Sequence, residues 1–419
     1  MQSADRAANL PGEGLAVAQI GSIIMYIIMA FVVVGVIGAI VRPERGVGKA
    51  FLDGVYSIGP IFIPVAGIMA ALPYIANLIE HYVAPGLRVM GADPAIAASL
   101  IAVDMGGYQL AETTADSLGG WILASLLAFT LGATLVFYIP VGMAMIPRAD
   151  HRYLGLGIMS GILTVPLSAL LSILALKTGA MLRPDVSTDA ESSWRFDIGW
   201  GSLFLGLAPV TVLVIAIAAG LRFAPEATLR TFMWFGRGVD WFAKIVFALV
   251  IVEYFTGFFS KLLGGWGLDP IIADEVDQFR ALEVAGYVSL ILAGVFPMVY
   301  VLCTYCTKPL GVIGRRLGLS ADGTAALVAA LANVLALFRL VPTLRPRDKV
   351  IAIAFMVCAT DALGGHLAYA ANVQPNLLVP LIIGKVVAGA VAILFARWLA
   401  FPIVDKLEKS GIRKESAPS

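Results

Sequence analysis

The sequence predicts an all-α protein that crosses a membrane many times, and three observations support this prediction. The chain has 419 residues, of which 59% are hydrophobic and only 14% charged, with a mean hydropathy of +0.90. A soluble domain carries about 25% charged residues. Long apolar stretches recur along the chain, and two shorter ones are interrupted by polar residues. We therefore expect about nine transmembrane helices plus two re-entrant or broken helical segments, arranged as an inverted repeat.

Each predicted span holds about 20 mostly apolar residues, the length that a bilayer requires. The nine spans lie near 20–41, 54–79, 118–146, 153–177, 200–222, 241–263, 284–307, 350–371 and 376–403, and the two shorter stretches are 95–112 and 321–341. This pattern divides the chain into an N-terminal tail (1–19), a first membrane repeat (20–177), an acidic loop with a linking span (178–240), a second membrane repeat (241–403) and a C-terminal tail (404–419).

The start of the chain does not look like a cleavable signal peptide. Its first 19 residues contain Asp5, Arg6 and Glu13 and lack a basic region followed by a short apolar core. We expect the first hydrophobic segment to remain in the membrane.

Loop charges indicate how the chain is oriented, because cytoplasmic loops carry the excess of Lys and Arg. If both short stretches return to the side from which they enter, the basic loops share one side. The acidic loops 178–199 and 264–283 then share the other side. If both stretches crossed, the basic loop 147–152 would lie outside and the acidic loop 178–199 inside, against the usual distribution of charge. We therefore expect re-entrant stretches, an N-terminus outside and a cytoplasmic C-terminus.

A weak internal repeat agrees with this topology. The run AASLIAVD that ends at Asp104 resembles AALVAALAN, which ends at Asn333, and Thr134 then corresponds to Thr360. Five predicted spans separate corresponding elements, so the two copies have opposite orientations. Inverted repeats with discontinuous elements that meet near the midplane are a recurring plan of secondary transporters.

The stretch 95–112 contains the first candidate site residues. Asp104 is a carboxylate at bilayer depth, which is costly and by default indicates function. Gly106 and Gly107 follow it and tolerate backbone geometry that a helix does not allow. The alternative for Asp104 is a structural carboxylate that caps or pairs with a buried helix end.

The second stretch and the span after it supply further candidates. Asn333 either contributes to the site or joins helices by hydrogen bonds. Thr360, Asp361 and His366 fall within one predicted span beside a Gly-Gly pair. His366 titrates near neutral pH if unperturbed, so it is either linked to proton movement or structural. Lys385 lies deep in the last span, where its ammonium must meet a carboxylate or carbonyl groups.

A small protonated amine suits these groups. An ammonium only donates hydrogen bonds and needs a carboxylate and carbonyl oxygens. The rings of Tyr108 and Tyr369 offer cation–π attraction, and a ligand hydroxyl could bond to Asn333 or Thr360.

The composition gives no indication of other partners. The net charge is +1, so no nucleic-acid partner is expected. The three cysteines, Cys303, Cys306 and Cys358, lie in apolar segments, which is typical of small core residues. We expect no cofactor and no metal; the oligomeric state stays open, with a homo-oligomer as one possibility.

Several motifs together resemble the ethanolamine-utilisation permease family of bacterial inner membranes. They are DMGGY at 104–108, YLGLGIMSGILTVP at 153–166, EVAG at 283–286, LAN at 331–333 and the ALGGHLAYAA…PLIIGK region at 362–385. The resemblance covers nearly the whole chain and implies uptake of ethanolamine for a cobalamin-dependent ammonia-lyase pathway. Asp104, Gly106, Gly107, Asn333, His366 and Lys385 match the family pattern.

Two positions depart from that pattern. Gly365 stands where the family has an Asp immediately before the histidine, and Val334 stands where a second Asn is usual. Asp361, four residues before Gly365, is expected one turn away on the same helix face. A shifted acid makes the substrate less certain than the family.

The sequence thus predicts a permease for ethanolamine or a related amino-alcohol in the bacterial cytoplasmic membrane. Asp104 would pair with the ammonium, Asn333 and Asp361 would complete the polar lining, and His366 would tune charge or coupling. The alternatives are a carrier for another small amine or metabolite and, remotely, an intramembrane enzyme that uses Asp104 and Asp361 as a carboxylate pair.

Overall fold

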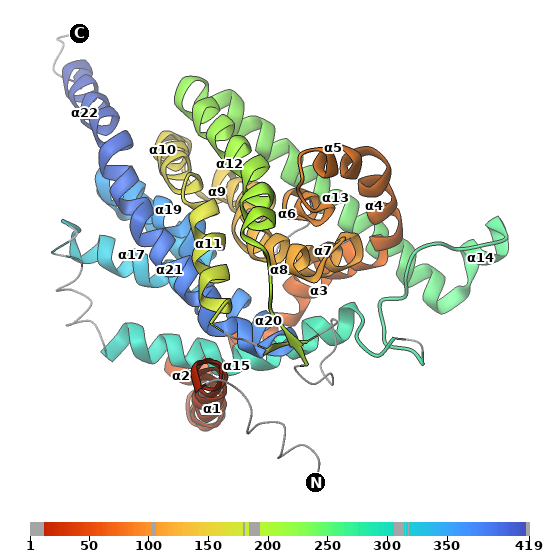
Figure 1. Ribbon diagram of the computed structural model, residues 1–419. Coiled ribbons are helices and arrows are strands. Elements are labelled where there is room, and N and C mark those ends of the chain that lie inside the picture. The colour runs from red at the N-terminus through yellow and green to blue at the C-terminus, as the bar shows by residue number, and fades with distance from the viewer. Residues whose placement is uncertain are drawn as a thin grey trace.

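The computed structural model describes residues 12–101, 106–178, 181–183, 193–275, 277–305, 314, 316 and 318–415. It is 84% helical, and Figure 1 shows helices throughout, with one small two-stranded element. This arrangement confirms the predicted all-α membrane fold.

The first half of the chain contains α1 (Gly12–Val41), α2 (Gly46–Tyr56), α3 (Ile58–Ala70), α4 (Leu72–Leu78), η2 (Ile79–Val83), α5 (Ala84–Val89), η3 (Pro94–Ala97), α6 (Ala98–Ile101), α7 (Gly106–Thr114), α8 (Leu118–Leu127), η4 (Ala128–Tyr138), α9 (Ile139–Met145), η5 (Arg148–Asp150), α10 (His151–Ile162), α11 (Val165–Leu176), β1 (Met181–Leu182) and β2 (Trp194–Arg195).

The second half contains α12 (Trp200–Phe223), α13 (Pro225–Thr256), α14 (Phe258–Leu263), α15 (Ala281–Tyr305), α17 (Ala321–Ala332), α18 (Val334–Leu340), η6 (Val341–Thr343), α19 (Pro346–Ala359), α20 (Gly365–Val373), η7 (Pro375–Leu377), α21 (Leu378–Phe395), η8 (Ala396–Ala400) and α22 (Phe401–Glu415).

Within the described residues, seven helical stretches are long and apolar enough to cross a membrane. They are Ile23–Val41, Gly46–Ala70, Leu118–Met145, Arg148–Leu176, Trp200–Phe223, Ala281–Leu302 and Pro375–Lys409. Three of the nine predicted spans are divided differently from the expectation. The range 54–79 is shifted, since the apolar stretch runs from Gly46 to Ala70 and the short helix α4 follows it. The range 241–263 is divided between α13, which begins 16 residues earlier, and α14, and the break lies at Gly257, a residue with φ of 59°. The range 350–371 is broken between α19 and α20.

The first short stretch returns to the side from which it enters. Asp93 precedes it, and Oδ1 of Asp93 accepts hydrogen bonds from the N–H groups of Ala95 (3.0 Å) and Asp116 (3.2 Å). Its Oδ2 accepts the N–H (3.1 Å) and the hydroxyl (2.9 Å) of Ser117. The beginning and the end of residues 94–114 are therefore adjacent, and we call this segment the first hairpin.

The second short stretch also enters and returns on one side. The hydroxyl of Ser320, which precedes α17, donates to Oδ2 of Asp348 in the first turn of α19 at 2.6 Å. At the other end of α17, the hydroxyl of Thr360 donates to the carbonyl of Ala330 at 2.6 Å. Because α17 and α19 begin together and end together, α18 must lead back to the side where α17 began. We call residues 321–340 the second hairpin.

The two hairpins close with the same chemical device. Ser117 caps α8 by accepting the N–H of Gly120, and Ser320 caps α17 by accepting the N–H of Gly323, each at 3.0 Å. In each case the serine hydroxyl donates to an aspartate from the other helix start, Asp93 or Asp348. A hydroxyl that both caps a helix and meets a carboxylate satisfies several end groups at once.

The hairpins enter from opposite ends of the molecule. The continuous helix Leu118–Met145 begins at the base of the first hairpin and is about 40 Å long. Just after its other end lies Asp150, whose Oδ1 pairs with Nζ of Lys349 at 2.6 Å. Lys349 follows Asp348, which closes the second hairpin. The bases of the two hairpins are thus separated by the length of a transmembrane helix.

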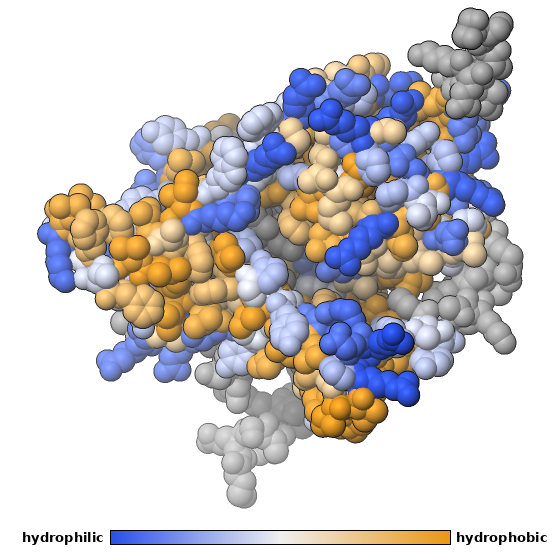
Figure 2. Space-filling model, turned by 180° about the vertical axis from the view of Figure 1, so that it is seen from behind, coloured by the Kyte–Doolittle hydropathy of each residue, from blue (hydrophilic) through white to orange (hydrophobic). Residues whose placement is uncertain are grey.

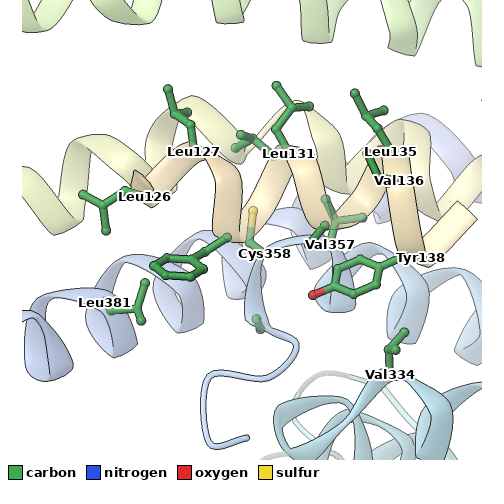
Figure 3. Close-up of a cluster of buried hydrophobic side chains, with 14 of the residues drawn as sticks. Leu126, Leu127, Leu131, Leu135, Val136, Tyr138, Val334, Val357, Cys358 and Leu381 are labelled. Carbon is green, nitrogen blue, oxygen red and sulfur yellow. The ribbon is translucent and has the colours of Figure 1, made fainter. Parts of the chain in front are cut away.

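The core lies where these elements meet. The central part of the long helix, η4, has π-helical hydrogen bonding and is almost entirely buried. Figure 3 shows Tyr138 of η4 on the side that faces Val357 and Cys358 of α19, with Val334 nearby, whereas Leu127, Leu131 and Leu135 point to the opposite side. Small residues allow close backbone contact elsewhere: a Cβ on Gly48 would lie 2.4 Å from the carbonyl carbon of Gly38 where α1 meets α2.

Candidate functional site

Several predicted site residues meet at Phe129, a residue of η4 that the sequence analysis did not single out. The carbonyl of Phe129 accepts a hydrogen bond from Nζ of Lys385 at 2.8 Å. Its ring lies 5.0 Å from the ring of His366 and 6.0 Å from that of Tyr369. Phe129, His366, Tyr369 and Lys385 are all fully buried. One residue of η4 therefore contacts predicted site residues on α20 and α21.

Phe129 lies near the start of η4, whose backbone hydrogen bonding is π-helical. Such π-helical turns often occur at functional sites. The ammonium of Lys385 is a charge-assisted donor for the Phe129 carbonyl oxygen. The expectation that Lys385 meets a carboxylate or a carbonyl is thus confirmed.

The first hairpin joins this centre through aromatic contacts. Tyr108 in α7 lies 5.6 Å from Tyr369 and 5.1 Å from Trp121, measured between ring centroids. The indole N–H of Trp121 donates to the carbonyl of Tyr108 at 3.0 Å. Gly106 and Gly107 are buried at the start of α7. A Cβ on Gly106 would lie 3.0 Å from Cγ2 of Ile68, so a larger residue would disturb the approach of α7 to α3.

The tip of the second hairpin is fixed to the break between α19 and α20. Besides the Thr360 hydroxyl, the N–H of Asp361 donates to the Ala330 carbonyl at 3.3 Å, and the N–H of Leu363 donates to the Leu331 carbonyl at 2.9 Å. Asn333 separates α17 from α18 in extended geometry, and its Oδ1 caps α18 by accepting the N–H of Leu335 at 2.7 Å. Asn333 therefore has a clear structural role at the tip.

Asp361 is not where the helical expectation placed it. The prediction put Asp361 on the same helix face as residue 365, one turn earlier. Instead α19 ends at Ala359, and Asp361 has a φ of 56°, in the left-handed region that costs a non-glycine residue free energy. Such strain is typical of functional sites. Its Oδ1 accepts the N–H of Gly365, the first residue of α20, at 3.4 Å.

Asp104 lies outside the described residues. The other nine predicted site residues are described and form one connected region. Tyr369, His366 and Lys385 contact Phe129, and Tyr108 joins them through Tyr369, with Gly106 and Gly107 just before it in α7. Thr360 and Asp361 donate to the Ala330 carbonyl, and Asn333 follows at the same hairpin tip. The short segment 361–366 links the two groups. Tyr369 keeps a buried hydroxyl with no hydrogen-bond partner among the described residues.

Residues of the acidic loop pack over the end of α20, a contact that the sequence analysis did not predict. The N–H of Arg183 donates to Oε1 of Gln374 at 2.8 Å, and Nε2 of Gln374 donates to the Arg183 carbonyl at 3.0 Å. The Arg183 guanidinium donates to the Asn372 carbonyl at 2.7 Å, and Asn376 donates to the Met181 carbonyl. The sequence analysis used this loop only to infer the orientation of the chain in the membrane. The presence of an arginine within an acidic loop was the available signal of a specific contact.

A second feature near the first hairpin is a cavity of about 430 Å³ at its base. Its polar lining includes Glu80 and Asp116, both of which bind the guanidinium of Arg88. Hydrogen bonding to Arg88 lowers the pKa of Asp116 below its ordinary value. The two carboxylates outnumber the single cation, so this opening carries a net negative charge.

The described residues contain no group of three or more His, Cys, Asp and Glu side chains that could hold a metal. What the fold provides is a multi-pass bundle with two opposed re-entrant hairpins and a buried aromatic and polar centre between them. This is the architecture of a membrane transporter.

The family model "Ethanolamine utilisation protein, EutH" matches residues 20–399, and the chain belongs to this family. It is 31% identical over 389 residues to "Probable ethanolamine permease EutH" of Listeria monocytogenes, covering 92% of this chain and 96% of the relative. It is 32% identical over 423 residues to the protein of the same name from Escherichia coli, covering 95% and 98%. An "Uncharacterized protein YxeR" of Bacillus subtilis is 31% identical, covering 90% and 94%. No solved structure matches the chain.

Proposed function

We propose that the chain is a permease that carries ethanolamine across the bacterial cytoplasmic membrane and binds the protonated amine midway between the two hairpin bases. The observation that carries the proposal is the convergence on Phe129: aromatic rings from α7 and α20 and an ammonium on a π-helical carbonyl lie in one buried centre. The relatives named probable ethanolamine permeases support the choice of substrate.

The chemistry of the centre suits a small ammonium ion. Backbone carbonyls at a helix break and at a π-helix are acceptors for N–H donors. The faces of Tyr108, Phe129 and Tyr369 are available for cation–π attraction, which is stronger where water is excluded. The buried Tyr369 hydroxyl offers a hydrogen bond to the ligand's own hydroxyl. Asp104 supplies the carboxylate in this proposal.

The proposed route begins at the negatively charged opening at the base of the first hairpin. The loop that carries Arg183 covers the carboxyl end of α20 and would restrict access to the centre. In the proposed orientation the N-terminus is outside and the C-terminus is cytoplasmic, so this opening faces outward.

The test is uptake of radiolabelled ethanolamine into liposomes that contain the purified protein. We expect saturable uptake that unlabelled ethanolamine suppresses. Asp104→Asn should abolish it, whereas Asp240→Asn should not, because Asp240 is exposed and forms its ion pair with Lys244 of its own helix. Undiminished uptake by Asp104→Asn would overturn the proposed site. Saturable uptake of labelled choline or propanolamine by the same liposomes, with no saturable uptake of labelled ethanolamine, would overturn the proposed substrate.

A further inference from the structure

A second cavity lies away from the proposed transport centre, at the end of the molecule that holds Asp150 and Lys349. It has a volume of about 800 Å³. Its walls come from the end of α9, the start of α10, the first four turns of α13 and one residue of α22. The lining residues are Met143, Arg148, His151, Arg152, Pro225, Glu226, Leu229, Arg230, Met233, Arg237 and Leu407. We call it the basic pocket.

The positively charged side chains that line this pocket outnumber the negatively charged ones. Four arginines line it, but only one carboxylate, that of Glu226. Among the residues that the structure describes, none of these four arginines forms an ion pair. Elsewhere the arginines at positions 88, 280 and 347 each bind at least one carboxylate. Several cations around one hollow create a strong positive potential that attracts an anion.

The pocket also has an apolar part and lies at a level typical of the membrane surface. Met143, Leu229 and Met233 line it together with the arginines. On the same helix, the side chains of Trp234 and Trp241 are more than half exposed. Exposed tryptophans gather where the hydrocarbon of the bilayer meets water. Figure 2 shows hydrophilic side chains gathered at the upper right, beside broad hydrophobic areas.

We propose that the basic pocket binds the phosphate head group of an anionic phospholipid. The guanidinium groups hold the phosphate oxygens, since arginine is a planar donor that can bind them in pairs. The apolar residues contact the glycerol and the upper part of the acyl chains. Basic pockets between helices on the cytoplasmic side are suited to such head groups, and the basic loops predict that this end is cytoplasmic.

The pocket is a site distinct from the transport centre, so the proposal does not depend on the identity of the carried solute. It also differs from a general attraction of basic loops to an anionic surface, because it depends on arginines that share one cavity. A matched change of charge outside the cavity therefore separates the two explanations.

The test uses the full-length protein purified in a neutral detergent, with thermal unfolding followed as lipid is added. Phosphatidylglycerol should raise the unfolding temperature of the unaltered protein in a saturable way, whereas phosphatidylcholine should not. The double variant Arg230→Gln, Arg237→Gln should need about tenfold more phosphatidylglycerol for the same shift. The control Arg222→Gln, Arg345→Gln removes the same charge outside the cavity and should behave like the unaltered protein.

Three results would overturn the proposal. An equal loss in both double variants would indicate attraction to the surface rather than a site. The same shift with inorganic phosphate at the concentrations at which the lipid acts would indicate a soluble phosphate ligand. An unaltered response of the Arg230→Gln, Arg237→Gln variant would exclude the pocket. If that variant is not recovered in folded form, the single change Arg237→Gln serves the same comparison.

Discussion

Gly364→Ala tests the junction between the second hairpin and the break after α19. Gly364 has φ −132° and ψ −129°. A Cβ there would lie 2.0 Å from the carbonyl oxygen of Ala332 and 2.8 Å from Oδ1 of Asp361. Ordinary contacts of this kind begin near 3.4 Å. The hairpin tip and the 360–364 segment must therefore separate by more than about 1 Å, which is typical of overpacking that costs about 1–3 kcal/mol.

The expected effect on transport follows from that displacement. Separation of the tip strains the hydrogen bonds that Thr360 and Leu363 donate to the hairpin carbonyls. A misplacement of about 1 Å in a positioned site can cost about 100-fold in rate. We expect the initial rate of ethanolamine uptake into liposomes to fall at least about tenfold, with the unfolding temperature lowered by several degrees.

The control for this variant is Gly201→Ala. Gly201 lies in α12, and a Cβ added to it would have nothing within 4 Å. Alanine there should leave uptake unchanged and stabilise the helix by up to about 1 kcal/mol. Uptake by Gly364→Ala equal to that of the unaltered protein would show that the junction does not position the transport site.

Three further predictions follow from the same geometry. Asp93→Ala removes four hydrogen bonds that close the first hairpin and should lower the free energy of unfolding by about 2–4 kcal/mol; calorimetry checks this, and an unchanged melting profile would contradict the closing role. Lys385→Met leaves the Phe129 carbonyl without its donor and should reduce uptake more than stability, because the buried charge is removed together with its desolvation cost; uptake rate and melting temperature measured on one preparation separate the two. Asp116 has a lowered pKa in the folded state because Arg88 donates to it. Its stabilising contribution is therefore present above the ordinary pKa of about 4 and is lost as pH falls through the lower folded pKa. Between pH 7 and 3 the melting temperature of Asp116→Asn should fall less than that of the unaltered protein, and identical profiles would refute this prediction.

Composition and loop charge predicted much of this fold because both follow directly from the properties of the bilayer. Apolar length located the long spans, and the two interrupted stretches proved to be hairpins. The closing contacts were not predictable, since Asp93 meets Ser117 and Ser320 meets Asp348 only after the chain has folded back. The spacing of residues along the sequence does not show which of them meet in the folded chain.

The candidate site was predictable to the extent that it depended on side-chain chemistry. A lysine deep in an apolar span must have acceptors, and Lys385 has one. The identity of that acceptor was not predictable, because Phe129 and Lys385 are 256 residues apart in the sequence and meet only in the folded chain. The left-handed conformation of Asp361 was also missed: the apolar run before it favours a continuous helix, and tertiary contacts with the hairpin tip override that preference.

The central claim is that the two hairpins enter from opposite faces of the membrane. Labelling with a membrane-impermeant maleimide tests it directly, in a chain whose native cysteines have first been replaced. Leu118→Cys reports the base of the first hairpin and Asp322→Cys that of the second; both positions are exposed. We predict that Leu118→Cys is labelled in intact cells, whereas Asp322→Cys is labelled only in inverted vesicles. Labelling of both cysteines from the same side would contradict the account.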